Sequence, residues 1–304
     1  ARAGHRDTPS QDPAARRPGS RVADRARTLG LALSGGGARC FAQVGALRAL
    51  EEAGWEVAAI AANSSAAVLA AVYAAEPDAR RLEEVVRAID FSSFLDPDGA
   101  TGLIGHAGVE ELLAEHAAPT FEDLAVPLVV PAVDVERAEM LVFGSGPLVP
   151  PVCASNAFPG LFAPVAYLGR KLMDGGIVNN FPVDLVRALT DRPVLAIDCR
   201  PAVAGPLELP DAGDASLLEK VGALFQRGVP TIVELLMRAY NITQDRVVEV
   251  TCALHPPDLR LRPALPDDLD IQDFSRMDEA IEAGYRAVAE AVAGGRFEAL
   301  TAVG

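Results

Sequence analysis

Two short apolar segments, each followed by small residues and then by a helical pattern, constrain the fold of this chain most. The first covers residues 28–34 and leads through three glycines into a helical pattern over residues 38–53. The second covers residues 57–61 and leads into an alanine-rich helix that reaches Ala75. Strands that alternate with helices in this way form parallel sheets with helices on both faces. The sequence therefore predicts an α/β fold of three layers around a mostly parallel central sheet.

Further segments extend this pattern toward the C-terminus. Residues 78–125 have the composition of helices and loops that form a cap beside the sheet. The predicted later strands cover residues 128–134, 139–143 and 194–198, a predicted hairpin joins residues 165–168 to 171–173, and the predicted helices cover residues 216–227, 231–239 and 275–293. We expect the later strands to join the same sheet.

The first 27 residues differ in composition from the rest. They contain seven Arg and three Asp with several Pro and Gly and almost no aliphatic side chains, which predicts a disordered tail before one domain over residues 28–300. The tail lacks the apolar core of a secretory signal. Together with four scattered cysteines, this favours a cytoplasmic protein. A basic tail can touch acidic lipid headgroups, but a solvated arm is the simpler interpretation.

The charge balance limits the choice of partners. The chain of 304 residues carries 27 basic and 42 acidic side chains, a formal charge of −15, and such a field repels the phosphate backbone of nucleic acids. The most apolar stretch is mostly alanine and is interrupted by polar residues, so no membrane-spanning helix is expected. No His, Asp and Glu cluster has the spacing of metal ligands, and we expect no cofactor.

The first glycine-rich segment connects a strand to a helix. Gly35, Gly36 and Gly37 stand between Ser34 and the pair Ala38-Arg39. Glycines let the backbone approach a ligand closely, and the N-terminus of a helix favours an anion. Neither nucleotide-binding glycine motif is present. We therefore expect this glycine loop to bind an oxyanion, and a nucleotide phosphate is the alternative ligand.

The second polar segment has the setting of a nucleophile elbow, a sharp turn that exposes a serine between a strand and a helix. Ser64 stands there with Ala62 and Ala66 two positions away on either side. By itself the pattern also fits a helix N-cap. Further along the chain, Asp174 begins an Asp-Gly-Gly turn after the predicted hairpin. Such turns are common, and alone this one indicates little.

Together these elements resemble the patatin-like phospholipase family, and its bacterial branch in particular. The resemblance rests on four ordered segments: LSGGGARCFAQVGAL at 33–47, IAANSSAA at 60–67, ASNAFPGLFAPV at 154–165 and DGGIVNNFPV at 174–183. Family members join a glycine-rich oxyanion loop, a serine elbow and a DGG or DGA loop. The resemblance extends from about residue 28 to residue 294.

The resemblance implies a patatin-like fold and a serine acyl-ester hydrolase acting on lipid esters, of the phospholipase A or lysophospholipase type. Ser64 would be the nucleophile and Asp174 its base, in a dyad without histidine. Backbone amides of the oxyanion hole would come from Ser65 and from the loop residues Gly35, Gly36 and Gly37, and Arg39 would help to hold that loop. The implied partner is a lipid or acyl-ester substrate, with transient contact to a membrane surface.

The sequence departs from the family at the elbow, where Ala62 and Ala66 replace two glycines. A catalytically weakened member that serves as a lipid-binding or scaffold module is therefore the alternative function. Ser65 is a competing nucleophile, although it would place Asn63 where a small residue is required. His255 follows Ser64 and Asp174 in the chain order of the α/β-hydrolase triads, which leaves a Ser-Asp-His arrangement open.

Overall fold

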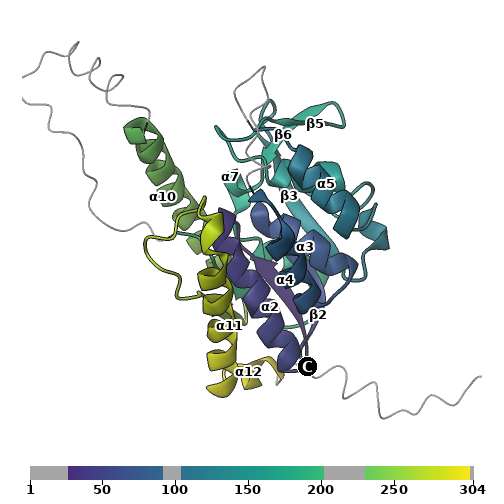
Figure 1. Ribbon diagram of the computed structural model, residues 1–304, viewed down its shortest axis with the longest axis vertical. Coiled ribbons are helices and arrows are strands. Elements are labelled where there is room, and N and C mark those ends of the chain that lie inside the picture. The colour runs from purple at the N-terminus through teal and green to yellow at the C-terminus, as the bar shows by residue number, and fades with distance from the viewer. Residues whose placement is uncertain (1–26, 92–103, 202–229, 302–304) are drawn as a thin grey trace, which may run out of the picture.

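The computed structural model describes residues 27–91, 104–201 and 230–301. All but the last residue of the tail predicted over residues 1–27, and all of the helix predicted over residues 216–227, lie outside the described residues. The division into a tail and one domain stays a prediction. Within the described residues, one sheet crosses the molecule and helices cover both of its faces (Figure 1).

Among the described residues, eight strands form this sheet in the order β5-β6-β3-β2-β1-β7-β8, with β4 paired to β3. Their bounds are β1 Thr28–Leu33, β2 Glu56–Ala62, β3 Leu128–Asp134, β4 Glu139–Phe143, β5 Val165–Tyr167, β6 Arg170–Asp174, β7 Val194–Ile197 and β8 Leu259–Leu261. The strands from β3 through β2, β1 and β7 to β8 pair in parallel. Strand β4 and the β5–β6 hairpin add antiparallel pairs at β3. The sheet is mostly parallel, as predicted.

Alternation along β1 explains the three layers, because successive side chains of a strand point to opposite faces. Leu31 and its odd-numbered neighbours pack into the core on one face, against helices that include α2, α3, α4 and α11. Ala32 packs on the other face, in a core cluster with side chains of α8 and α10. The helices are α2 Phe41–Glu52, α3 Ser65–Ala75, α4 Ala79–Ala88, α5 Ala107–His116, α6 Val149–Ser155, α7 Gly176–Asn179, α8 Val183–Leu189, α10 Pro230–Leu254, α11 Met277–Ala293 and α12 Glu298–Thr301, with short 3-10 turns η1 Gly37–Cys40, η3 Phe121–Asp123 and η4 Phe274–Arg276.

Helix α10 is longer than the helix predicted over residues 231–239. The residues after Ala239 include Asn, Ile, Thr and Val, which are weak helix formers. One face of the extended helix carries Tyr240, Gln244 and Val248 at four-residue spacing, and Gln244 and Val248 are almost fully buried. Packing of this face therefore outweighs the local preference. No helix within the described ranges, α10 included, is both long and apolar enough to cross a membrane.

Helices α2 and α11 approach each other closely at two glycines. A β-carbon added to Gly284 would overlap the backbone of Ala42, and one added to Gly45 would overlap the backbone of Ile281. The helix predicted over residues 275–293 is found as α11, where Ile281 and Val288 are buried. Because neither glycine has a β-carbon, the backbones of α2 and α11 can lie in direct contact at these two points.

We predict that Gly284→Ala lowers the free energy of unfolding by about 1–3 kcal/mol, because the added methyl group overpacks the α2–α11 contact. Chemical denaturation followed by circular dichroism measures the change. Gly105→Ala is the matched control, since nothing lies within 4 Å of the added β-carbon there. A Gly284→Ala protein as stable as the control would contradict the close-packing argument.

Candidate active site

The turn between β2 and α3 holds Ser64 in a strained backbone conformation. Its φ of 59° and ψ of −137° lie in a region that non-glycine residues rarely occupy, at a cost on the order of 1–3 kcal/mol. Ser64 immediately precedes α3, so its side chain lies between the end of a strand and the first turn of a helix. Ala62 and Ala66 flank it and are fully buried. The sharp turn is therefore present with these two methyl groups in place.

Asp174 lies at the end of β6, where the antiparallel pairing with β3 sets it opposite Ala132. Its carboxylate is almost fully buried. The Ser64 hydroxyl lies close enough to stabilise its charge, and Oδ1 accepts hydrogen bonds from the Gly176 amide at 2.7 Å and from Asn63 Nδ2 at 2.9 Å. Burial raises the pKa of Asp174 to about 6, although these hydrogen bonds act in the opposite direction. The structure thus brings together the serine and the aspartate singled out in the sequence.

Asn63 connects the two sides of the site. Its Nδ2 donates both to Asp174 and to Asn180 Oδ1, the latter at 3.0 Å. Its Oδ1 accepts from the Ser155 hydroxyl at 3.2 Å, and the oxygen of that hydroxyl accepts from the Ser64 amide at 3.2 Å. Asn63 and Ser155 are both fully buried. A chain of hydrogen bonds through Ser155 and Asn63 therefore connects the Ser64 amide to the Asp174 carboxylate and holds the two in place.

Sequence reasoning missed Asn63, Ser155 and Asn180 as parts of the site. All three lie inside the segments that carry the family resemblance. Ser155 is the last residue of α6, a helix for which the sequence analysis made no prediction. Two prolines in the first turn of α6 were the available signal, because proline is favoured at the start of a helix.

The glycine loop after β1 lies beside the elbow. The Gly35 amide donates to the backbone oxygen and to Oδ1 of Asn180, at 3.2 and 3.1 Å. In the part of the chain that the structure describes, the amides of Gly36, Gly37 and Ser65 have no protein acceptor. Gly37 has a φ of 58°, and a β-carbon on it would overlap Ile271, so this position requires glycine. The loop therefore offers amides that a bound oxyanion can use.

Arg39 fastens the glycine loop to the end of the sheet. Its side chain is almost fully buried; Nε donates to the Cys199 oxygen at 3.0 Å, and Nη1 donates to the Leu269 oxygen at 2.6 Å. Burial lowers the pKa of this guanidinium from its usual value. Both contacts are to backbone oxygens, so Arg39 positions the loop after β7 and the loop before η4 relative to the glycines.

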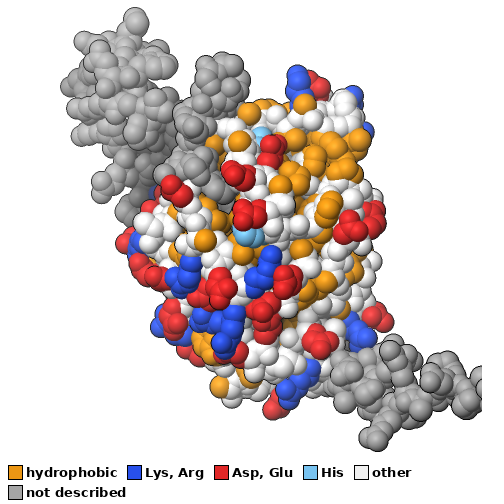
Figure 2. Space-filling model, turned by 45° about the vertical axis from the view of Figure 1, so that its right-hand side comes forward, with side chains coloured by type: hydrophobic (Ala, Val, Ile, Leu, Met, Phe, Trp, Pro, Cys, Tyr) orange, Lys and Arg blue, Asp and Glu red, His pale blue; other side chains and the backbone are white. Residues whose placement is uncertain are grey.

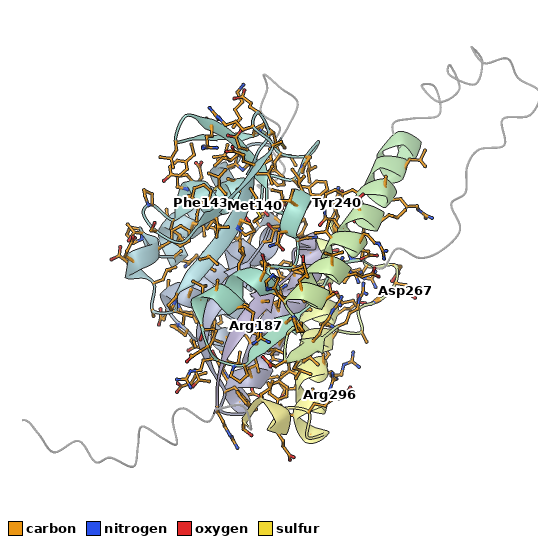
Figure 3. The ribbon with its side chains drawn as sticks, turned by 180° about the vertical axis from the view of Figure 1, so that it is seen from behind. Met140, Phe143, Arg187, Tyr240, Asp267 and Arg296 are labelled. Carbon is orange, nitrogen blue, oxygen red and sulfur yellow. The ribbon has the colours of Figure 1, made fainter. Side chains whose placement is uncertain are left out.

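The two alternatives for the catalytic side chains occupy different places. The Ser65 hydroxyl donates to Asn156 Oδ1 at 3.3 Å. His255 is exposed beyond the end of α10, fifteen residues past Tyr240, which corresponds to about 22 Å of helix. Tyr240 of α10, labelled in Figure 3, reaches the site. Its ring packs edge-on against that of Phe158, with centroids 5.3 Å apart. In the described part of the chain the Asp174 carboxylate accepts hydrogen bonds from Asn63 and Gly176, lies beside the Ser64 hydroxyl, and has no histidine as a partner.

An apolar cavity of about 150 Å³ opens at Ser64. Besides Ser64, Ser65, Gly37, Asn156 and Gln272, its walls are apolar: Phe41, Val68, Leu69, Val86, Ile89, Phe91, Val109, Leu112, Phe158, Leu161, Phe162, Ile271 and Phe274. The aromatic and aliphatic run noted in the sequence near Phe158 lines this cavity. A hydrocarbon chain next to the serine is what such walls accommodate.

One wall of the cavity is an aromatic cluster. The rings of Phe91 and Phe274 stack with centroids 4.8 Å apart, and Phe41 meets Phe91 edge-on at 5.5 Å. Phe91, Phe274 and Ile89 also line a second hollow, which contains charged residues such as Arg87. The stacked rings therefore lie between the apolar cavity and a hollow whose lining mixes apolar residues such as Met277 with charged ones.

The remaining reactive side chains lie outside this arrangement. Cys40, Cys153 and Cys199 are buried free thiols, and burial raises the pKa of each, to about 12 for Cys153 and Cys199. Thiols in that state are poor nucleophiles. Among the described residues no group of three or more His, Cys, Asp and Glu could hold a metal ion.

Comparison with known proteins finds a matching family model and similar curated proteins. Residues 31–187 match the family model described as Patatin-like phospholipase. The chain is 28% identical over 280 residues to the NTE family protein Rv2565 of Mycobacterium tuberculosis, covering 88% of this chain and 46% of the relative. It is 30% identical over 289 residues to human Patatin-like phospholipase domain-containing protein 6, covering 88% of this chain and 20% of the relative. The chain thus spans less than half the length of either relative.

The fold also has a counterpart among solved structures. The crystal structure of VipD from Legionella pneumophila superimposes with a TM-score of 0.57 at 14% sequence identity, covering 88% of this chain and 67% of that chain. The likeness concerns the fold, and it agrees with the three-layer patatin-like architecture predicted from the sequence.

We predict that the stability difference between Asp174→Asn and the native protein depends on pH. The pKa of Asp174 is about 6 in the folded protein, against an ordinary value of 3.8. Above pH 6 its ionisation therefore lowers the free energy of unfolding by the full amount. This loss disappears as the pH falls toward 4. Asp174→Asn cannot ionise and gains nothing from this change. As the pH falls from 6 to 4, its free energy of unfolding should therefore drop by on the order of 3 kcal/mol relative to that of the native protein. Urea denaturation at several pH values measures it, and a difference that does not vary with pH would contradict the buried, ionised carboxylate.

Proposed function

Because the chain belongs to the patatin-like phospholipase family, whose model matches residues 31–187, we propose that it hydrolyses acyl esters of lipids through Ser64 and Asp174. The observation that carries the proposal is that the Ser64 hydroxyl lies next to the buried Asp174 carboxylate and lowers its pKa against the effect of burial. The strained backbone of Ser64 supports it, since strain of this kind gathers at functional sites.

In the first half of the reaction, Asp174 takes the proton of the Ser64 hydroxyl while Oγ forms a bond to the ester carbonyl carbon. The carbonyl oxygen becomes an oxyanion, which accepts hydrogen bonds from the amides of Gly36, Gly37 and Ser65. Each such donor is worth about 3 kcal/mol in the transition state. Gly35, expected from the sequence to be a fourth donor, is assigned to hold Asn180, because its amide is already engaged there.

Collapse of the intermediate breaks the bond to the alcohol, which leaves with the proton from Asp174, and an acyl–Ser64 ester remains. In the second half, Asp174 removes a proton from water, the resulting hydroxide attacks the acyl carbon, and Ser64 recovers its proton. Every group on this route belongs to the chain. A base is most effective when its pKa lies near the working pH, and the raised pKa of Asp174, about 6, suits a reaction near neutral pH.

The cavity at Ser64 supports a lipid as the substrate. Its apolar walls favour a hydrocarbon chain through burial of about 25 cal/mol per Å² of apolar surface. We propose that the acyl chain of a phospholipid or lysophospholipid occupies it, with the headgroup outside. Such a substrate implies transient contact with a membrane surface during catalysis.

We predict that Ser64→Ala lowers kcat/KM for a p-nitrophenyl acyl ester by at least about 10³-fold, because it removes the nucleophile. Asp174→Asn should lower it by at least about 10²-fold, since it removes the base. Labelling with a fluorophosphonate probe, read by mass spectrometry, identifies the reactive residue.

Ser65→Ala and His255→Ala are the controls for this prediction, and both should retain turnover. Loss of turnover in His255→Ala would favour the triad, and labelling of Ser65 would move the nucleophile by one position. A native protein that is neither labelled nor active on any lipid ester would favour the lipid-binding or scaffold alternative.

We predict that Phe274→Ala shifts the preference toward longer acyl chains, raising the ratio of kcat/KM for long over short esters by at least about tenfold. The truncation opens the wall between the cavity and the hollow beyond it. A series of esters of increasing chain length measures the ratio. Phe143→Ala is the matched control, because Phe143 packs against Tyr167 rather than lining the cavity, and an equal shift in both variants would refute this role of the wall.

A further inference from the structure

A further hollow, separate from the apolar cavity and from the hollow beyond Phe91 and Phe274, lies between β8 and α11. Its volume is about 460 Å³ and it shares no lining residue with the cavity at Ser64. Four arginines line it, Arg260, Arg262, Arg286 and Arg296, and Glu290 is the only acidic residue among its lining residues. We call this hollow the arginine pocket.

Its shape follows from an edge strand and a helix with small side chains. Strand β8 pairs with β7 and stands at the end of the strand order, so its other edge faces the pocket. Ala283, Ala287 and Ala291 recur at four-residue spacing on α11, which places them on one face of the helix. Their short side chains leave the space open. Arg296, labelled in Figure 3, comes from the turn between α11 and α12.

Two of the four arginines of the arginine pocket have no acidic partner among the described residues. Arg260 pairs with the buried Asp198, and Arg286 has only a contact of 3.5 Å to Glu282, with both side chains well exposed. Arg262 donates to the backbone oxygen of Arg200 at 3.0 Å, and Arg296 donates to that of Arg260 at 3.4 Å. In the described ranges neither of these two has a carboxylate within 4.0 Å. The carbonyl oxygens orient the two guanidiniums and leave their charges unpaired.

The sign of this cluster is opposite to the net charge of the chain. The whole chain carries a charge of −15, and on the face shown in Figure 2 basic and acidic side chains lie interspersed. Guanidiniums gathered around one hollow repel each other unless an anion lies between them, and a hollow lined by one sign of charge concentrates ions of the opposite sign. The planar donors of arginine match the oxygens of a phosphoryl group in particular.

From these observations we propose that the arginine pocket binds a phosphoryl group with at least two negative charges, held mainly by Arg262 and Arg296. A free phosphate compound and the headgroup of a lipid phosphomonoester share this chemistry. The site is independent of the catalytic proposal, because none of its residues takes part in the reaction at Ser64.

Isothermal titration of the full chain with inorganic pyrophosphate tests the site. The variant carrying Arg262→Ala and Arg296→Ala should bind at least about tenfold more weakly than the native protein, since two charged donors are lost. The matched control carries Arg80→Ala and Arg246→Ala, which removes two positive charges from exposed side chains elsewhere. It should bind like the native protein. Thermal melts of all three proteins verify their folding.

Flotation with phosphatidylcholine vesicles, with and without phosphatidic acid, distinguishes the two sources of the phosphoryl group. Capture that requires phosphatidic acid and is lost in the pocket variant identifies a lipid headgroup. Pyrophosphate binding without such capture identifies a soluble phosphate compound. The proposal is overturned if the native protein binds neither, or if the control variant loses binding as much as the pocket variant does.

Discussion

A carboxylate buried next to a serine hydroxyl is the interaction on which the rest of the site depends. Burying an ionised group costs free energy unless hydrogen bonds compensate it, and Asp174 is almost fully buried. Its compensation comes from neutral groups, the Gly176 amide and Asn63 Nδ2 together with the Ser64 hydroxyl. Because these groups do not neutralise the charge, the pKa stays raised. The surrounding strand ends and turns hold these donors in place.

The sequence predicted those parts of the structure that local patterns encode. The strands and glycine turns follow from short apolar segments and from residues that allow sharp turns. Ser64 and Asp174 were singled out because an ordered set of such segments resembles the patatin-like phospholipase family. The length of α10 was missed, because its second half is stabilised by packing of Tyr240, Gln244 and Val248 rather than by its own helix propensity. The roles of Asn63 and Ser155 were missed because a buried asparagine or serine has no local signature. Its hydrogen-bond partners lie far away in the sequence.

The family relationship supports the fold of the chain, and the local geometry supports the proposed substrate. Membership in the patatin-like phospholipase family and the likeness to VipD establish the architecture. The chain spans less than half the length of the two curated relatives described above. The substrate is therefore argued from the cavity itself, whose apolar walls end at the stacked rings of Phe91 and Phe274.

The distance along the chain between the two central residues has a consequence for biosynthesis. Asp174 follows Ser64 by 110 positions (174 − 64), and the hairpin that carries it adds to β3 only after β1 and β2 have been translated. A chain still growing on the ribosome therefore exposes its serine long before the aspartate emerges. Any fragment that ends ahead of β6 has the elbow without Asp174, so the proposed acyl transfer must await translation of β6.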